Sequence, residues 1–322
     1  MKRSKDLMLF KADENEYVFK GLLLFLYVYI GASIFAAIFT PLVFWLVEWI
    51  NTNCPCQLSE YLMRKRISVY YDRLRWIPII ISLPFILKEC GLLSFKNLGI
   101  SFDKHSLKIF GKFWLFGAIA VCSIFAVQIL FVGATARDGL KIASILFAAI
   151  SGSIILSFLE EIVFRGLLMR SIYTALGSLS GIVLSSLFFA YKHFKVPKEI
   201  WKVLPDGGHS AEWYSGFVVC YYDTIGISYN FQLIPFLSLF VFGVLLCIFY
   251  IRTKTLLSSI AFHSGAVCLM MCFKKSFKLN SYDNQFIFGN EWITNGCVGL
   301  GALCLVLLIS ILFIKQSKKS LM

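Results

Sequence analysis

The sequence predicts an all-α fold, a polytopic membrane bundle of about eight transmembrane helices. Of its 322 residues, 58% are hydrophobic and only 15% are charged. The mean hydropathy of +0.77 lies far from that of soluble globular domains. Several apolar runs also approach the roughly 20 residues that cross a bilayer. These observations together predict a multi-pass helical membrane protein.

The predicted helices follow one another along most of the chain. They lie near residues 21–50, 76–93, 113–135, 141–159, 179–194, 231–251, 256–273 and 294–314, and the fourth continues to about 176. Pro41 predicts a kink or a tilt in the first helix. Pro78 and Pro84 interrupt the helical pattern of the second.

The net charge of +13 is concentrated in loops and tails. The basic tails contain Lys2, Arg3 and Lys5 at one end and Lys315, Lys318 and Lys319 at the other. An even number of helices puts both tails on one side, which the positive-inside rule makes the cytoplasm. The loop 51–75 is equally basic and would then lie on the opposite side, so the orientation is open. Such patches meet anionic lipid, and we expect the bilayer rather than nucleic acid as the partner.

The ten cysteines predict no disulfide framework, because most fall in or beside apolar runs, where cysteine acts as a small hydrophobe. Cys54-Pro55-Cys56 is the one close pair, and its spacing favours neither a zinc site nor a relaxed disulfide. We expect no special role for it.

The insert 195–230 is rich in Trp, Tyr and Lys, which predicts a segment at the lipid headgroups. Simple anchoring is the favoured interpretation, and a lid over a membrane-embedded site is the alternative.

Two adjacent carboxylates, Glu160 and Glu161, follow directly on the apolar run 142–159. An ionised group at this depth costs about 3 kcal/mol on insertion scales, so an acidic pair there indicates a functional site. Glu161 and Arg165 are four residues apart and share a helix face, which predicts an ion pair. Glu160 points about 100° away and lacks that partner. A desolvated carboxylate without a counter-charge suits proton transfer.

We therefore predict that Glu160 is the reacting carboxylate and that Glu161 and Arg165 form a structural pair. In the alternative, both glutamates simply bridge to Arg165 and Arg170 at a helix end. Glu161 lies sixteen residues before Gly177, and a histidine lies sixteen residues after that predicted turn. In an antiparallel hairpin, both would lie about 24 Å from the turn, at one depth.

That histidine is His193, which the helical repeat places on one face with Phe189. A histidine level with a buried glutamate can share a proton with a water between them. His263 falls in the middle of a later apolar helix, a position that usually faces a bundle interior. His105 and His209 lie in predicted loops, and we assign them no role.

Three ordered elements resemble one protein family, the CAAX-protease and bacteriocin-processing (CPBP, or Abi) family of intramembrane endopeptidases, which includes CAAX prenyl protease 2-like enzymes. The elements are Glu-Glu-x-x-x-Arg (Glu160, Glu161, Arg165), Phe-x-x-x-His (Phe189, His193) and the later His263. The resemblance covers about residues 140–273, which we take as a family-like core. Residues 1–139 supply N-terminal helices and loops, and 274–322 supply a last helix and a basic tail, all in one integrated membrane domain.

The resemblance implies that Glu160 and His193 activate a water for attack on a peptide carbonyl. It implies that His263 stabilises the oxyanion or helps to hold the water. No cofactor is expected from the family, and zinc bound by Glu160, His193 and His263 is the minority alternative. The implied substrate is a peptide or protein, prenylated or of the leader-peptide type. The implied location is the cytoplasmic membrane of a bacterium or the endoplasmic reticulum membrane of a eukaryote.

The chain departs from the family at Val267, where the family usually has an asparagine one turn after the histidine. Losing one oxyanion donor costs on the order of 100- to 1,000-fold in rate. Ser259, one turn before His263, is a candidate replacement donor. Valine at position 267 therefore leaves three interpretations open: a slower enzyme, a rearranged oxyanion site, or a scaffold that has lost catalysis.

The leading hypothesis is thus a membrane endopeptidase. The alternative is a catalytically impaired family member that acts in immunity or binds a partner. A proton-coupled transporter is the third hypothesis, because glutamate and histidine also relay protons in membranes. The inverted repeats typical of transporters are not evident in the sequence.

Overall fold

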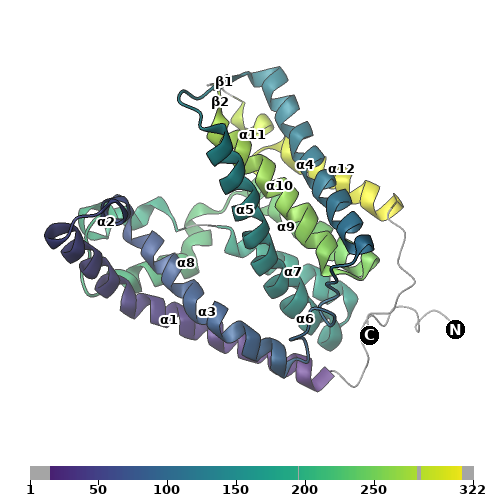
Figure 1. The fold of residues 1–322 in the computed structure, drawn as a ribbon, viewed down its shortest axis with the longest axis horizontal. Coiled ribbons are helices and arrows are strands. Elements are labelled where there is room, and N and C mark those ends of the chain that lie inside the picture. The colour runs from purple at the N-terminus through teal and green to yellow at the C-terminus, as the bar shows by residue number, and fades with distance from the viewer. Residues whose placement is uncertain (1–14, 195, 281–283, 314–322) are drawn as a thin grey trace. The chain divides into compact units, whose positions relative to one another are not determined.

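The computed structural model describes residues 15–194, 196–280 and 284–313. The basic residues of the two tails, on which the orientation argument depends, lie outside these ranges. Within them the protein is almost entirely helical (Figure 1). The described sheet is a two-stranded antiparallel ribbon of β1 (Ala134–Ala136) and β2 (Phe277–Leu279). The all-α prediction is confirmed.

Each of the eight predicted segments contains a helix. These are α1 (Asn15–Asn53), α3 (Ile67–Glu89), α4 (Lys104–Val132), α5 (Ile142–Glu161) continuing through η2 (Ile162–Met169) and α6 (Arg170–Leu176), α7 (Ser178–Lys192), α9 (Leu233–Thr253), α10 (Leu256–Ser276) and α12 (Cys297–Phe313). The sequence analysis did not predict the shorter helices α2 (Gln57–Met63), η3 (Lys198–Lys202), η4 (Pro205–Gly208), α8 (Ser215–Asn230) and α11 (Gln285–Phe288).

Five of the described helices are long and apolar enough to cross a membrane. They are Leu22–Asn53, Lys104–Val132, Ile142–Leu176, Leu233–Thr253 and Leu256–Ser276. The apolar helices α7 and α12 are shorter. Helix α3 was predicted to span the membrane, but it is neither one of the five long apolar helices nor one of the two shorter ones. Its first turns carry the charged residues Asp72, Arg73 and Arg75. These helices support a multi-pass membrane protein.

The chain forms two compact units. The first unit comprises Met1–Phe19, Cys90–Tyr191 and Gln232–Met322. The second unit comprises Lys20–Glu89 and Lys192–Phe231. The division of the sequence near residues 139 and 273 stays a prediction.

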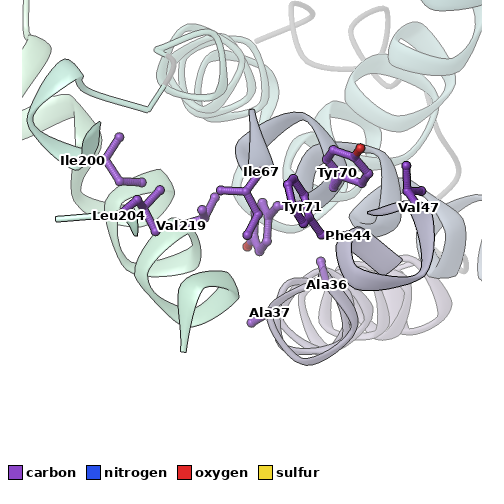
Figure 2. Packing of buried hydrophobic residues seen from close by; sticks show 10 residues of the cluster. All are labelled: Ala36, Ala37, Phe44, Val47, Ile67, Tyr70, Tyr71, Ile200, Leu204 and Val219. Carbon is purple, nitrogen blue, oxygen red and sulfur yellow. The ribbon is translucent and has the colours of Figure 1, made fainter. Parts of the chain in front are cut away.

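The core of the second unit is built from α1, α3 and the insert that contains η3, η4 and α8. Figure 2 shows its buried side chains: Ala36, Ala37, Phe44, Val47, Ile67, Tyr70, Tyr71, Ile200, Leu204 and Val219. Helix α8 approaches α1 closely, because a Cβ on Gly216 would lie 1.9 Å from the Ala37 carbonyl oxygen. The insert is therefore a packed part of this unit. Its predicted anchoring at the headgroups stays a prediction.

Cys56 has a structural role that corrects the expectation for the Cys54-Pro55-Cys56 pair. Its side chain caps the N-terminus of α2 by accepting a hydrogen bond from the backbone N–H of Ser59. That hydrogen bond lowers the pKa of the Cys56 thiol, because it favours the thiolate. The structure describes all ten cysteines, and none of them forms a disulfide.

In the first unit, α10 packs along α4, and the two helices lie side by side in Figure 1. Two glycines permit the approach from opposite sides. A Cβ on Gly117 would lie 2.1 Å from the carbonyl oxygen of Phe262, and one on Gly265 would lie 2.1 Å from the carbonyl oxygen of Trp114. Small residues let helix backbones meet closely in membranes. On α10 the contact residues Phe262 and Gly265 lie on either side of His263 in the sequence. The position of that histidine therefore depends on how closely α10 packs against α4.

We expect Gly117→Ala to destabilise the protein by about 1–3 kcal/mol, because the added methyl meets backbone atoms that cannot rotate away. Gly111 on the same helix is the matched control, since a Cβ there meets nothing within 4 Å. Gly111→Ala should be neutral or stabilising through its better helix propensity. Thermal unfolding of the purified variants in one detergent measures the difference. Equal midpoints for the two variants would contradict the close approach.

Candidate active site

The helix that carries the glutamates changes from α to π immediately after them. Helix α5 ends at Glu161, and Ile162–Met169 form the π segment η2, all of it buried. The prediction that the helix continues to about residue 176 is confirmed by the unbroken span Ile142–Leu176, but the α-helical geometry assumed for it does not hold in this part. A π turn contains more residues than an α turn, so the estimate of about 24 Å from Glu161 to the turn, which assumes the α-helical rise, does not apply. Such segments are frequent at functional sites.

Glu161 and Arg165 form the predicted ion pair inside the protein. The Arg165 Nη1 donates to Glu161 Oε1 at 2.8 Å, and the side chains are 1% and 0% exposed, respectively. Arg165 also donates through Nη2 to the carbonyl oxygen of Gly243 on α9 at 3.3 Å. A buried charge is tolerated when it is paired and hydrogen-bonded. These contacts join α9 to the helix that carries the glutamates.

His263 lies between the two glutamates and is 3% exposed. Its Nδ1 is 2.9 Å from Glu161 Oε1, and its Nε2 is 3.9 Å from Glu160 Oε2. Because the Glu161 carboxylate faces the Arg165 guanidinium, we assign it as the acceptor and the Nδ1–H of His263 as the donor of this hydrogen bond. In a neutral imidazole, Nε2 is then an acceptor that faces Glu160.

Glu160 differs from Glu161 in both exposure and partners. Its side chain is 13% exposed. Within the described part of the chain, Glu160 Oε2 has no hydrogen-bond partner. The site therefore contains one carboxylate engaged with an arginine and a histidine and a second with an oxygen able to accept a proton.

Two phenylalanines pack against these polar groups. The Phe189 ring on α7 lies 4.5 Å from the Arg165 guanidinium and 6.1 Å from the imidazole of His263. The Phe242 ring on α9 lies 5.3 Å from the same imidazole. The sequence analysis singled out Phe189 but missed Phe242, because Phe242 belongs to no motif and lies in a uniformly apolar helix.

His193 is half-buried and follows the end of α7 at Lys192. Since the helix ends one residue before it, His193 lies outside the predicted helix 179–194, and its sharing a face with Phe189 stays a prediction. His193 belongs to the second unit, whereas the glutamates and His263 belong to the first. Its proximity to Glu160 stays a prediction.

Ser259 lies one turn before His263 on α10, and Val267 lies one turn after it. Neither residue offers a hydroxyl or amide proton to the site in this arrangement. Ser259 donates its hydroxyl to the Leu246 carbonyl oxygen at 2.8 Å, so the expected replacement donor is already used. Val267 is apolar and half-buried.

Among the residues that the structure describes, no three His, Cys, Asp or Glu side chains are grouped as ligands of a metal ion. Catalysis without a metal stays a prediction, and zinc stays the minority alternative.

A family model supplies an independent comparison. The model, described as Rce1-like (type II CAAX prenyl endopeptidase Rce1-like), matches residues 141–269. The resemblance to CAAX proteases is confirmed. The Rce1-like segment contains the ordered motif residues, and it supports a membrane endopeptidase in general terms. No curated protein and no solved structure matches the chain.

Proposed function

We propose that the protein is an intramembrane endopeptidase in which Glu160 is the general base. One observation carries the proposal: Glu160 has a carboxylate oxygen without a hydrogen-bond partner, 3.9 Å from the Nε2 acceptor of His263, within the Rce1-like segment. A general base needs such an oxygen within reach of a water. Among the described residues, Glu161 Oε2 is likewise without a partner, but Glu161 is fully buried and its Oε1 is engaged by both Arg165 and His263, whereas the Glu160 side chain is 13% exposed and so open to water.

The proposed reaction is the hydrolysis of one peptide bond. Glu160 takes a proton from a water that it shares with His263 Nε2, and the water oxygen attacks the carbonyl carbon. The resulting tetrahedral intermediate collapses when Glu160 returns the proton to the amide nitrogen and the C–N bond breaks. The products are a carboxylic acid and an amine, which become a carboxylate and an ammonium when the acid passes its proton to the amine through water, and Glu160 is again ionised.

The hydrogen bond between Nδ1 and Glu161 supports one of the two roles that the family resemblance implies for His263. An unprotonated Nε2 accepts a hydrogen bond from the water and cannot donate one to an oxyanion. We therefore assign His263 to holding the water. Glu161 orients the imidazole in the way that a carboxylate orients the histidine of a catalytic triad.

The alternative function is that of a catalytically impaired family member. The arrangement at Ser259 and Val267 favours it, because neither residue supplies the donor that the family places there. We infer a slow enzyme rather than an inactive one, since Glu160 and His263, to which we assign the activation and the holding of the water, lie together. The proposed substrate is a membrane-bound peptide, either prenylated or of the leader type.

The test is cleavage by the purified protein in liposomes. We expect a fluorogenic prenylated peptide to be cut, and the rate to be unchanged by a metal chelator. The same peptide without its prenyl group and a leader-type peptide would define the substrate class. Loss of activity with chelator that zinc restores would place a metal in the site. If the folded protein cleaves none of these peptides, the non-catalytic function is favoured instead.

A further inference from the structure

Helix α9 contributes to the site although it bears no polar side chain there. Its Gly243 carbonyl oxygen accepts from Arg165, and the preceding residue, Phe242, packs against His263. Gly243 also lets α7 come close, because a Cβ there would lie 3.0 Å from the Cβ of Ser186. The adjacent residues Phe242 and Gly243 of α9 thus contact the histidine, the arginine and helix α7.

The rings of Phe189, Phe242 and His263 form a compact group. The two phenylalanine rings are 6.2 Å apart and inclined by only 26° to each other. Each is inclined by 76° to the imidazole, at 6.1 Å for Phe189 and 5.3 Å for Phe242. Edge-to-face contacts of this kind contribute about 0.5–1.5 kcal/mol each. The imidazole therefore meets two roughly parallel rings at a steep angle.

We propose that Phe242 is a positioning residue that holds the imidazole of His263 with Nδ1 on Glu161 and Nε2 toward Glu160. The torsion that turns a histidine ring is broad, so the single hydrogen bond to Glu161 leaves the ring plane free to tilt. A tilted ring takes Nδ1 out of line with Glu161 and Nε2 out of line with Glu160. Phe242, which is buried and has no polar atom, restricts that tilt by contact with the ring, while the hydrogen bond to Glu161 selects which ring edge faces it.

Phe242→Leu removes the ring and keeps an apolar residue of good helix propensity. The matched control is Phe249→Leu on the same helix. Phe249 is also buried, but its ring packs against Phe113, Phe116 and Phe262. A general loss of packing should affect both variants, whereas a loss of His263 orientation should affect only the first.

The first readout is independent of catalysis. The chain has only four histidines, so nitrogen-15 spectra of histidine-labelled protein are simple, and His263→Gln assigns the relevant signals. We expect one Nδ1-protonated form of His263 in the unsubstituted protein and in Phe249→Leu. We expect Phe242→Leu to show a second or averaged set of His263 signals. If it aggregates, Phe242→Met provides the same test with a side chain closer in volume.

The second readout rests on the proposed function. For cleavage of the prenylated peptide, we expect Phe242→Leu to lower kcat about 10-fold while KM changes little, because the water and not the peptide is misplaced. Unchanged His263 signals in folded Phe242→Leu would overturn the proposal, whatever happens to the rate. Altered signals in a protein that cleaves no peptide would sustain the positioning role and refute only the peptidase function.

Discussion

Glu160→Gln is expected to reduce peptide cleavage by about 100- to 10,000-fold, the range that a positioned general base contributes. The amide has nearly the same shape as the carboxylate but cannot take the proton of the attacking water. Glu160 has no salt bridge to an arginine or lysine among the described residues, so the substitution should leave the fold intact. The measurement is the initial rate in liposomes, with membrane insertion and thermal unfolding checked on the same preparation.

Glu161→Gln is the matched control, one residue away on the same helix. It removes the negative charge that pairs with Arg165 and leaves only the weaker amide oxygen as an acceptor for His263 Nδ1, so we expect lower stability together with a partial loss of rate. The two variants should therefore separate activity from stability. An inactive Glu161→Gln protein beside an active Glu160→Gln protein would show that the two roles are reversed.

Arg165→Met is expected to lower the free energy of unfolding by about 3–5 kcal/mol, the cost of removing one partner of a buried ion pair. The loss arises mainly because the fully buried Glu161 would keep its charge without a guanidinium. The Gly243 carbonyl oxygen would also lose its donor. Methionine is unbranched and apolar, so it fills much of the space that the arginine stem occupies.

The double variant Glu161→Gln with Arg165→Met tests this reason directly. It leaves no unpaired charge, and replacing both members of a buried pair is often close to neutral. We expect it to recover much of the stability lost in Arg165→Met but little activity, since His263 loses its orienting carboxylate. Unfolding by denaturant in a fixed detergent measures all three variants. Strict additivity of the two single effects would contradict the ion pair.

The helices were largely predictable because a membrane span is a local property of composition and length. All eight predicted segments contain helices, and the apolar runs alone located them. Helix α8 was missed because its Trp- and Tyr-rich surroundings predicted a segment at the lipid surface. Its structure depends on packing against α1, which no local pattern encodes.

The end of α7 and the π segment were mispredicted for a related reason. Hydropathy does not distinguish α from π turns, because both bury the same apolar residues. It also places the end of a helix only to within a few residues, which was enough to misplace His193. Both errors affected the expected distances of Glu161 and His193 from the turn at Gly177. Neither error changed which residues were predicted for the site.

The sequence by itself determined the membrane class, the short-range pair of Glu161 and Arg165, and the family resemblance. Helical spacing brings residues four apart together whatever surrounds them. Only the tertiary structure placed His263 between the two glutamates and Phe242 against its ring, because these contacts join helices far apart in the chain. Long-range packing depends on the shapes of all the facing side chains at once, and a local pattern contains none of that information.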